Sequence, residues 1–427
     1  MRDRDLPDPL PPGHPEPAEA GSSASHRRMA RSGVNLACGA VLAGGSLLFV
    51  AQGLFDDGAL RAVQDHVITY SLSRQVAESH EYFRDFTYPL PAVIFKLLLG
   101  WPGMAFSSVL WSLCSLIAFA ALIVGMIELL GDLADERALL APTLACLVWV
   151  WCVQWDFRAV NVNLVFLAMA LWGLIRAQGQ HLVSAGALLA ASVALKLYAA
   201  PLIVYLAFRG WWRGLIWAGA FGCVFFALAP IVYFGPSDAW MLTGLWLRNV
   251  VAAMQPGFVV ELIAYKVSLE WVLLSFVGGG DEGAGGLYAA LRGVQLGVVL
   301  WLVGYLWLGS RRGDCRQVGE RLLADAGLVL SSMVLLSPLA EPHHGVVALL
   351  PATLLAHVAL DAGRGQRARI SAAAVLAGVA LALQAAPSGA WKAAAFTLGL
   401  LAMILSLPIV ERMQTGVSSR LIAASNS

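Results

Sequence analysis

The sequence predicts an all-α integral membrane protein, and three observations carry that prediction. Hydrophobic residues make up 59% of the 427 residues, whereas charged residues make up only 13%. A typical soluble domain is about 25% charged, so this chain lacks the polar residues to cover a water-facing surface. Its apolar residues also fall into runs of the length that a membrane-crossing helix needs, about 20 residues, and we predict a bundle of about 11–13 such helices.

Polar segments flank the hydrophobic region at both ends. Residues 1–28 are rich in Pro, Ser, Ala, Glu and Asp and lack apolar periodicity, which predicts a disordered tail. Basic residues at 26–31 precede the first apolar run and place the N-terminus in the cytoplasm by the positive-inside rule. We therefore expect a cytoplasmic tail over 1–28, a polytopic membrane domain over 29–412 and a second cytoplasmic tail over 413–427.

Twelve apolar stretches are candidate spans, and the second of them is short enough to be a half-span or an interfacial segment. They lie near 34–55, 89–100, 104–130, 139–155, 160–177, 182–207, 212–234, 286–309, 321–338, 343–361, 370–386 and 390–410.

Arginines in the late loops set the predicted orientation. The clusters at 311–321 and 364–369 belong on the cytoplasmic side, and Arg412 and Arg420 place the C-terminus there too. Counting spans from these points puts the long first loop, 56–88, on the outer side. Two further segments fall outside by the same count: residues 341–344, and the stretch 235–285, which we interpret mainly as a loop with one or two interfacial helices.

The middle of the chain allows two topologies. A simple count places residues 155–158 inside and Arg176 outside, although the positive-inside rule prefers Arg176 inside. That preference is met if 89–130 crosses only once in effect. Residues 182–207 would then form two short halves with Lys196 at the outer turn, and the sequence does not decide between these arrangements.

The first outer loop is long and mixes charged with apolar residues. Apolar residues between 60 and 68 recur with helical spacing, which predicts a helix lying on the membrane surface. That helix would hold Asp65 and His66 near the interface.

Acidic residues in this loop are candidates for acid–base chemistry. Asp56 and Asp57 follow the first span directly, and capping with solvation explains them as well as catalysis does. Asp65 is open to the same two interpretations. Arg84 and Tyr88 stand at the end of the loop, and we predict that both contact substrate.

A second polar group opens a late span. Glu341, His343 and His344 surround Pro342. Ionisable residues at a membrane boundary are costly to desolvate, so such a group indicates a functional site. An imidazole can accept or donate a proton, or bind a phosphate oxygen when charged. Adjacent histidines point to different helix faces, so we do not expect the two to share one role. Glu341 is also favourable simply as a helix-start residue.

Polar side chains also interrupt the middle spans. Lys196 is the single lysine of a long apolar stretch, and it needs a counter-charge or a water-filled cavity unless it snorkels to the interface. Tyr198 follows it, and Pro201 permits a helix break. Asn161 and Asn163 could bind sugar hydroxyls, although cross-linking helices is the more common use of such amides.

The composition also excludes several classes of protein. The net charge of +1 gives no basic field for a nucleic acid. The six cysteines lack the spacing of a metal site or a disulfide framework, so we predict neither a bound metal nor another cofactor.

Four motifs in shared order resemble glycosyltransferase family 87 of the GT-C superfamily. Tyr82 with Phe86-Thr87-Tyr88-Pro89 is similar to the family's entry to its second span, and Lys196-Leu197-Tyr198 to its Lys-Leu-Tyr-Pro stretch. Ser337-Pro338 through His343-His344 is similar to its Ser-Pro…His-His stretch, and an acidic residue follows the first span. Asn161-Val162-Asn163 is a weaker match, and Leu90 and Ala199 stand where the family has Pro.

The resemblance implies a GT-C-like fold and a polyprenol-phosphate-mannose-dependent type of activity. A carboxylate among Asp56, Asp57 and Asp65 would act as general base on an acceptor hydroxyl, with inversion at the sugar carbon. His343 or His344, with Lys196, would stabilise the leaving lipid phosphate. The substrate-binding residues would be Tyr88, Arg84, Asn161, Asn163, Lys196, Tyr198 and Glu341.

The expected partners are a polyprenyl-phosphate sugar, a glycolipid or polysaccharide acceptor, and membrane lipid. The resemblance implies a plasma (inner) membrane location with an extracytoplasmic active site. A multi-pass transporter or lipid flippase is the alternative, and it would predict inverted repeats. A polymer ligase that uses the same donor on another acceptor is a third possibility.

Overall fold

The computed structural model describes residues 64–82, 87–101, 103–131, 135–253, 284–311, 318–337, 340–361, 364–386 and 390–425. Across these segments the chain is helical and contains no strand, which confirms the all-α prediction. The expected first span, 34–55, and both predicted tails except the helical end at 413–425 lie outside the described residues.

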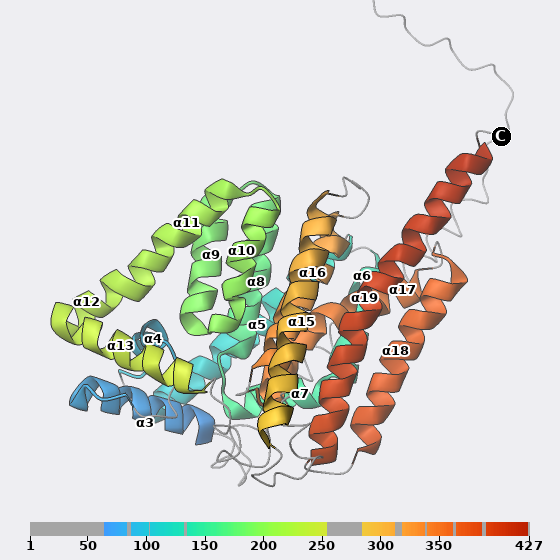
Figure 1. Cartoon of the computed structure of the whole chain (residues 1–427). Helices are drawn as coiled ribbons and strands as arrows, with labels where there is room; N and C mark the ends of the chain where they lie inside the picture. Colours follow the sequence, from blue (N-terminus) through green and yellow to red (C-terminus); the bar gives the residue numbers. More distant parts are fainter. Residues whose placement is uncertain are drawn as a thin grey trace, which may run out of the picture.

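The centre of the molecule is a bundle of helices that alternate in direction (Figure 1). One continuous core joins them, and it includes the fully buried Trp111, Phe166 and Phe396. The helices of this bundle are α5 (Met104–Leu130), α6 (Glu136–Val148), α8 (Asn163–Gln178), α9 (Leu182–Leu195), α10 (Ala200–Phe208), α15 (Ala284–Arg311), α16 (Val318–Leu336), α17 (Leu349–Leu360), α18 (Gln366–Ala385) and α19 (Ala390–Ser425). The short α7 (Val150–Ala159) is set at an angle of 73° to α6.

Four described helices are long and apolar enough to cross a membrane: Phe106–Leu130, Trp212–Phe234, His343–Leu360 and Gln366–Ala385. These match four of the predicted spans. The span Trp212–Phe234 comprises α11 (Trp212–Cys223), a π-helical turn (Val224–Leu228) and α12 (Ala229–Phe234). Shorter apolar helices of 10–17 residues occupy most of the other predicted positions in the described chain. The chain is therefore a multi-pass membrane protein.

A smaller group of helices lies across one end of the bundle (Figure 1). It consists of α3 (Gln64–Ser79), α4 (Leu90–Leu99) and α13 (Pro236–Ala253). Val76, Leu90 and Trp246 pack together in a separate hydrophobic cluster. The Trp246 indole also donates a hydrogen bond to the carbonyl of Thr87, at 3.0 Å. The helices predicted within the first loop and within 235–285 are therefore present, and both belong to this group.

Two features of the middle of the chain match the second arrangement that the sequence allowed, in how the helix ends are placed relative to one another. α6 begins beside Asp361, where Arg137 pairs with it, and runs toward the end that carries His343. α7 bends from α6 by 73°, which breaks the predicted span 139–155 and keeps residues 155–158 at that end. The predicted span 182–207 is likewise two short helices, α9 and α10, with Lys196 between them. A count that places residues 155–158 at the opposite end is wrong, because it takes 89–100 as a full crossing, whereas α4 has only ten residues and packs in the group that lies across one end of the bundle.

Two polar groups lie at opposite ends of the same helices. α16 begins near Glu320 and ends before Ser337, and the η3 turn (Pro342–Ala348) leads from His343 into α17, which ends near His357. The 19 residues of α16 span roughly 28 Å at 1.5 Å per residue, which is close to the thickness of the hydrocarbon core.

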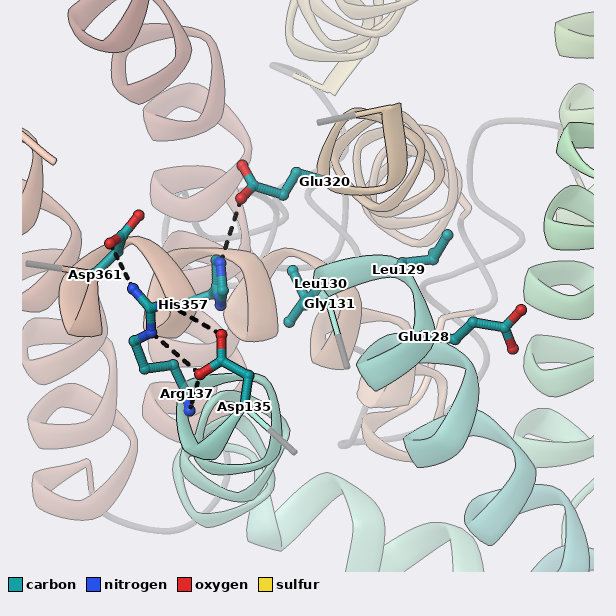
Figure 2. Close-up of a pocket in the computed structure, with 9 residues that line it drawn as sticks. All are labelled: Glu128, Leu129, Leu130, Gly131, Asp135, Arg137, Glu320, His357 and Asp361. Carbon is teal, nitrogen blue, oxygen red and sulfur yellow. Dashed lines mark hydrogen bonds and ion pairs between the residues drawn. The ribbon is translucent and has the colours of Figure 1, made fainter. Parts of the chain in front are cut away.

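The group near Glu320 is a network of ion pairs around a cavity of about 290 Å³ (Figure 2). Arg364 binds both Glu320 oxygens, at 2.5 and 2.6 Å, and Asp361 at 3.0 Å. Arg137 joins Asp361, at 2.7 Å, to Asp135, the N-cap residue of α6. Burial raises the pKa of Asp135, but hydrogen bonds from Arg137 outweigh it, and the net pKa lies below its ordinary value. The network ties together the ends of α6, α16, α17 and α18.

Candidate functional site

The candidate site forms where several helices are interrupted at one end of the bundle. α7 ends at Ala159, and Val160 adopts φ +48°, a left-handed conformation that a β-branched residue rarely takes. The strained turn places Asn161 and Asn163 directly before and at the start of α8. Unusual backbone of this kind concentrates at functional sites.

A second interruption positions Lys196. α9 ends at Leu195, and Lys196 has an extended backbone with φ −156° and ψ 124°. A short 3-10 turn (η1, Leu197–Ala199) then leads into α10, whose first turn contains Pro201. Proline lacks the N–H that a continuing helix needs and its ring crowds the preceding turn, so Pro201 favours a break between α9 and α10 over one continuous helix.

A third interruption presents the two histidines. The chain leaves α16 at Leu336 and re-enters helix through η3, which begins with Pro342. His343 and His344 are both buried, with 4% and 6% of their surfaces exposed. Breaks near residues 160, 196 and 342 therefore bring together side chains that are far apart in the sequence.

Asn161 and His343 are joined across 182 positions of sequence. The Asn161 amide nitrogen lies 3.0 Å from Nε2 of His343. The Asn161 side-chain oxygen accepts from the Val162 N–H, at 2.7 Å, and from the Tyr88 hydroxyl, at 3.5 Å. Because the oxygen is used by these donors, the amide nitrogen must donate to His343. In the neutral ring the His343 proton is then on Nδ1, which faces Glu341 Oε2 at 3.7 Å.

His344 has the opposite tautomer. Its Nδ1 accepts a hydrogen bond from the backbone N–H of Glu341, at 2.8 Å. A backbone N–H can only donate, so in the neutral ring the His344 proton must be on Nε2. The two imidazoles lie with ring centroids 4.4 Å apart. One histidine is thus oriented as an acceptor toward an asparagine, and its neighbour presents an Nε2–H donor.

Asn163 links Lys196 to the buried carboxylate of Asp156. The Lys196 ammonium donates to the Asn163 oxygen at 2.6 Å, and the Asn163 nitrogen donates to Asp156 at 2.7 Å and to the His343 carbonyl at 3.2 Å. The ammonium also lies 5.5 Å from the ring centroid of Tyr198, within the range of a cation–π contact.

The remaining described members of the site are aromatic or hydroxyl-bearing. The Tyr198 hydroxyl is 2.8 Å from the Ser337 hydroxyl, and its ring meets His344 edge-on at 5.2 Å. The Tyr88 ring lies near two ammonium groups, with centroid distances of 5.2 Å to Lys96 and 5.9 Å to Lys196. Tyr88, Asn161, Asn163, Lys196, Tyr198, Glu341, His343 and His344 therefore form one connected network, although they were predicted separately.

The predicted acidic residues are not placed in this network. Asp56, Asp57 and Arg84 lie outside the described residues, and for Asp65 the structure describes only its backbone position, the second residue of α3. Its neighbour His66 is 1% exposed and contacts the Ser107 hydroxyl at 3.1 Å. Burial, with a smaller effect from the Lys96 charge, lowers the pKa of His66 to about 3. His66 therefore anchors α3 to α5 as a neutral ring.

Sequence reasoning missed two buried charges, Asp156 and Lys96. Asp156 is fully buried, and Lys96 is 2% exposed and hydrogen-bonds the Thr69 hydroxyl. Each is an ionisable residue in or beside an apolar run, the signal that singled out Lys196. That rule, applied to every such residue, finds both. Within the described segments, no three His, Cys, Asp or Glu side chains are grouped as they would be in a metal site.

The fold and this network define a helical membrane protein with a polar site at one end of its bundle. Comparison with known families matches residues 86–338, more than half of the chain, to glycosyltransferase family 87. The chain belongs to this family and is therefore a membrane glycosyltransferase. The matched region contains Asn161, Asn163, Lys196 and Tyr198, and it ends at Pro338, shortly before the two histidines.

No curated protein and no solved structure matches the chain. The family assignment favours the transferase over the transporter or flippase that the sequence left open.

Proposed function

We propose that the protein transfers a hexose, mannose, from a polyprenyl-phosphate sugar to a hydroxyl group of a glycolipid or polysaccharide. The reaction takes place at the outer face of the plasma membrane and inverts the sugar carbon. The observation that carries this proposal is the convergence of Lys196, His344 and two asparagines at one end of the bundle. Positive charge and fixed N–H donors are what a departing phosphate requires.

The proposed step is a single displacement. The acceptor oxygen forms a bond to the sugar carbon while the bond from that carbon to the phosphate oxygen breaks, and the lipid phosphate leaves with the bonding electrons. A carboxylate of Asp56, Asp57 or Asp65 takes the acceptor proton, because general-base catalysis lowers the barrier when proton removal accompanies attack.

Each described residue has a distinct role in this proposal. The Lys196 ammonium and the His344 Nε2–H stabilise the leaving phosphate. His343 and Asn161 orient the turn that carries His344. The Glu341 backbone N–H, 2.8 Å from Nδ1 of His344, fixes the tautomer of that ring. Tyr88, Asn163 and Tyr198 line the substrate path, and Arg84, which lies outside the described residues, is assigned to substrate binding from the family resemblance.

Purified protein in nanodiscs, supplied with radiolabelled polyprenyl-phosphate mannose and with the corresponding glucose and galactose donors, tests the donor. We expect transfer from the mannose donor, and absence of transfer from every lipid-phosphate sugar contradicts the proposal.

The general base is tested by three single substitutions, Asp56→Asn, Asp57→Asn and Asp65→Asn. One of them should lose about 10²–10⁴-fold in turnover, and full activity in all three removes the carboxylate mechanism.

A further inference from the structure

Asp156 is a buried carboxylate for which the family resemblance offers no role. It has 0% exposure on α7, and its two oxygens accept hydrogen bonds from the Asn163 amide, at 2.7 Å, and the Leu164 N–H, at 3.3 Å. α8 has no side-chain cap of its own at Val162. The carboxylate therefore occupies the positive end of the α8 dipole from a neighbouring helix, which accounts for its position but not for its link to Lys196.

The Asn163 amide transmits the position of Asp156 to Lys196. Its nitrogen has two protons, and both have acceptors, the Asp156 carboxylate and the His343 carbonyl, at 2.7 and 3.2 Å. Its oxygen accepts from the ammonium of Lys196 at 2.6 Å. With two acceptors on one side and an ammonium on the other, the amide has only one consistent orientation. A carboxylate and an ammonium are thus linked through the Asn163 amide.

Resting on the proposed function, we propose that Asp156 is a positioning residue that balances the charge of Lys196 through Asn163. It holds the ammonium at the leaving-group site while limiting the net positive charge there. The limit matters because the product is a lipid phosphate. An unbalanced buried ammonium would retain that anion and slow its release, whereas a balanced one releases it after each turnover.

The direction in which anion affinity changes when Asp156 is substituted separates this role from a structural one. Removing a negative charge close to an anion site strengthens anion binding. Loosening a helix cap disorders the site and weakens binding of every ligand. Asp156→Asn keeps one acceptor oxygen for Asn163 and removes only the charge.

The experiment compares binding of farnesyl phosphate and of uncharged farnesol to the full-length protein in nanodiscs, together with turnover. In Asp156→Asn we expect farnesyl phosphate to bind roughly 3- to 10-fold tighter, farnesol binding to be unchanged, and turnover to fall. Asp325→Asn is the matched control, because Asp325 is also a buried carboxylate, 3% exposed and hydrogen-bonded to Tyr205 at 2.7 Å, but outside the site network. Its farnesyl phosphate affinity should change less than about twofold.

The outcomes distinguish this role from the proposed function. If the wild-type protein binds no farnesyl phosphate, both the proposed donor chemistry and the charge-balancing role of Asp156 are overturned. If the wild type binds it and Asp156→Asn binds no tighter, only the charge-balancing role is overturned. Should Asp156→Asn not fold, Asp156→Ser replaces it, since the hydroxyl keeps one acceptor and the same tighter binding is required.

Discussion

Buried charge is handled differently at the two ends of this bundle. Near Glu320, guanidinium and carboxylate groups touch directly, and Arg364 is held by Glu320 at 2.5 and 2.6 Å and by Asp361 at 3.0 Å. Near Lys196, the ammonium and the Asp156 carboxylate are linked through the Asn163 amide. Direct ion pairs fasten helix ends, whereas at the Lys196 end a neutral amide stands between the ammonium and the Asp156 carboxylate.

The backbone at the two ends differs in the same way. At the Glu320 end the helices begin and end at the edge of the bundle, with Asp135 capping α6 and Gly131, at φ +156°, ending α5. The Lys196 end consists of interrupted helices, a left-handed valine and two short 3-10 turns. Irregular backbone at membrane depth occurs where it is buried in protein or lines a cavity. The comparison predicts that substitutions at the Glu320 end mainly lower stability, while substitutions at the Lys196 end mainly lower activity.

The largest expected effect is on stability, at the Glu320 end. Arg364→Met removes a guanidinium that is 6% exposed and leaves the Glu320 carboxylate with less compensation. Breaking a buried pair from one side costs about 3–5 kcal/mol. We expect the free energy of unfolding in detergent to fall by that amount, while folded protein at low temperature keeps its transferase activity.

The exposed pair of Arg74 and Glu78 supplies the control for this measurement. These side chains touch at 2.8 Å but are 59% and 65% exposed. Because solvent screens such a pair, Arg74→Met should change the unfolding free energy by at most about 1 kcal/mol. Equal losses in the two variants would show that the Glu320 network contributes nothing beyond a surface contact.

The next effect is on activity, at the other end. Lys196→Met removes the cation proposed to face the leaving phosphate, and loss of one such donor costs about 10²–10³-fold in turnover. Lys196→Arg keeps the charge and should recover part of the rate. The measurement is turnover with saturating donor, alongside the melting temperature. A melting temperature that falls as far as in Arg364→Met, with little change in turnover, would reverse the comparison between the two ends.

The two histidines sharpen the comparison within the site. His344→Ala removes the Nε2–H donor and should reduce turnover by about 10²-fold. His343→Gln can keep an acceptor for Asn161 and should reduce it less, by about tenfold or below. Turnover of the two variants is measured in steady-state assays over the same range of donor concentrations. A larger loss in His343→Gln would mean that the tautomer assignment does not decide which ring acts on the phosphate.

Much of this arrangement could be predicted from local sequence. The break at Lys196 follows from one lysine in an apolar stretch and from Pro201, and the histidine turn follows from Pro342. Partners could not be predicted in this way, because Asn161 and His343 are 182 positions apart and only the packed fold brings them together. Asp156 was missed for a different reason, since a count that took 89–100 as a full crossing placed residues 155–158 at the wrong end. The ten-residue α4 packs with α13 across one end of the bundle, and the apolar run at 89–100 does not by itself decide between that placement and a crossing.

The smallest expected effect concerns the hydroxyl of Tyr198. Its oxygen is 2.8 Å from the Ser337 hydroxyl, while its ring packs against His344 at 5.2 Å and lies near the Lys196 ammonium at 5.5 Å. Tyr198→Phe removes the hydrogen bond and keeps the ring. The free energy of unfolding should therefore fall by the contribution of one neutral hydrogen bond, about 0.5–1.5 kcal/mol. Because the ring still orients His344 and Lys196, turnover should fall less than about threefold, whereas Tyr198→Leu should lose about tenfold through the missing aromatic face. Equal turnover in Phe and Leu variants would show that the ring does not hold the two donors, and the Lys196 end would then depend on its asparagine amides alone.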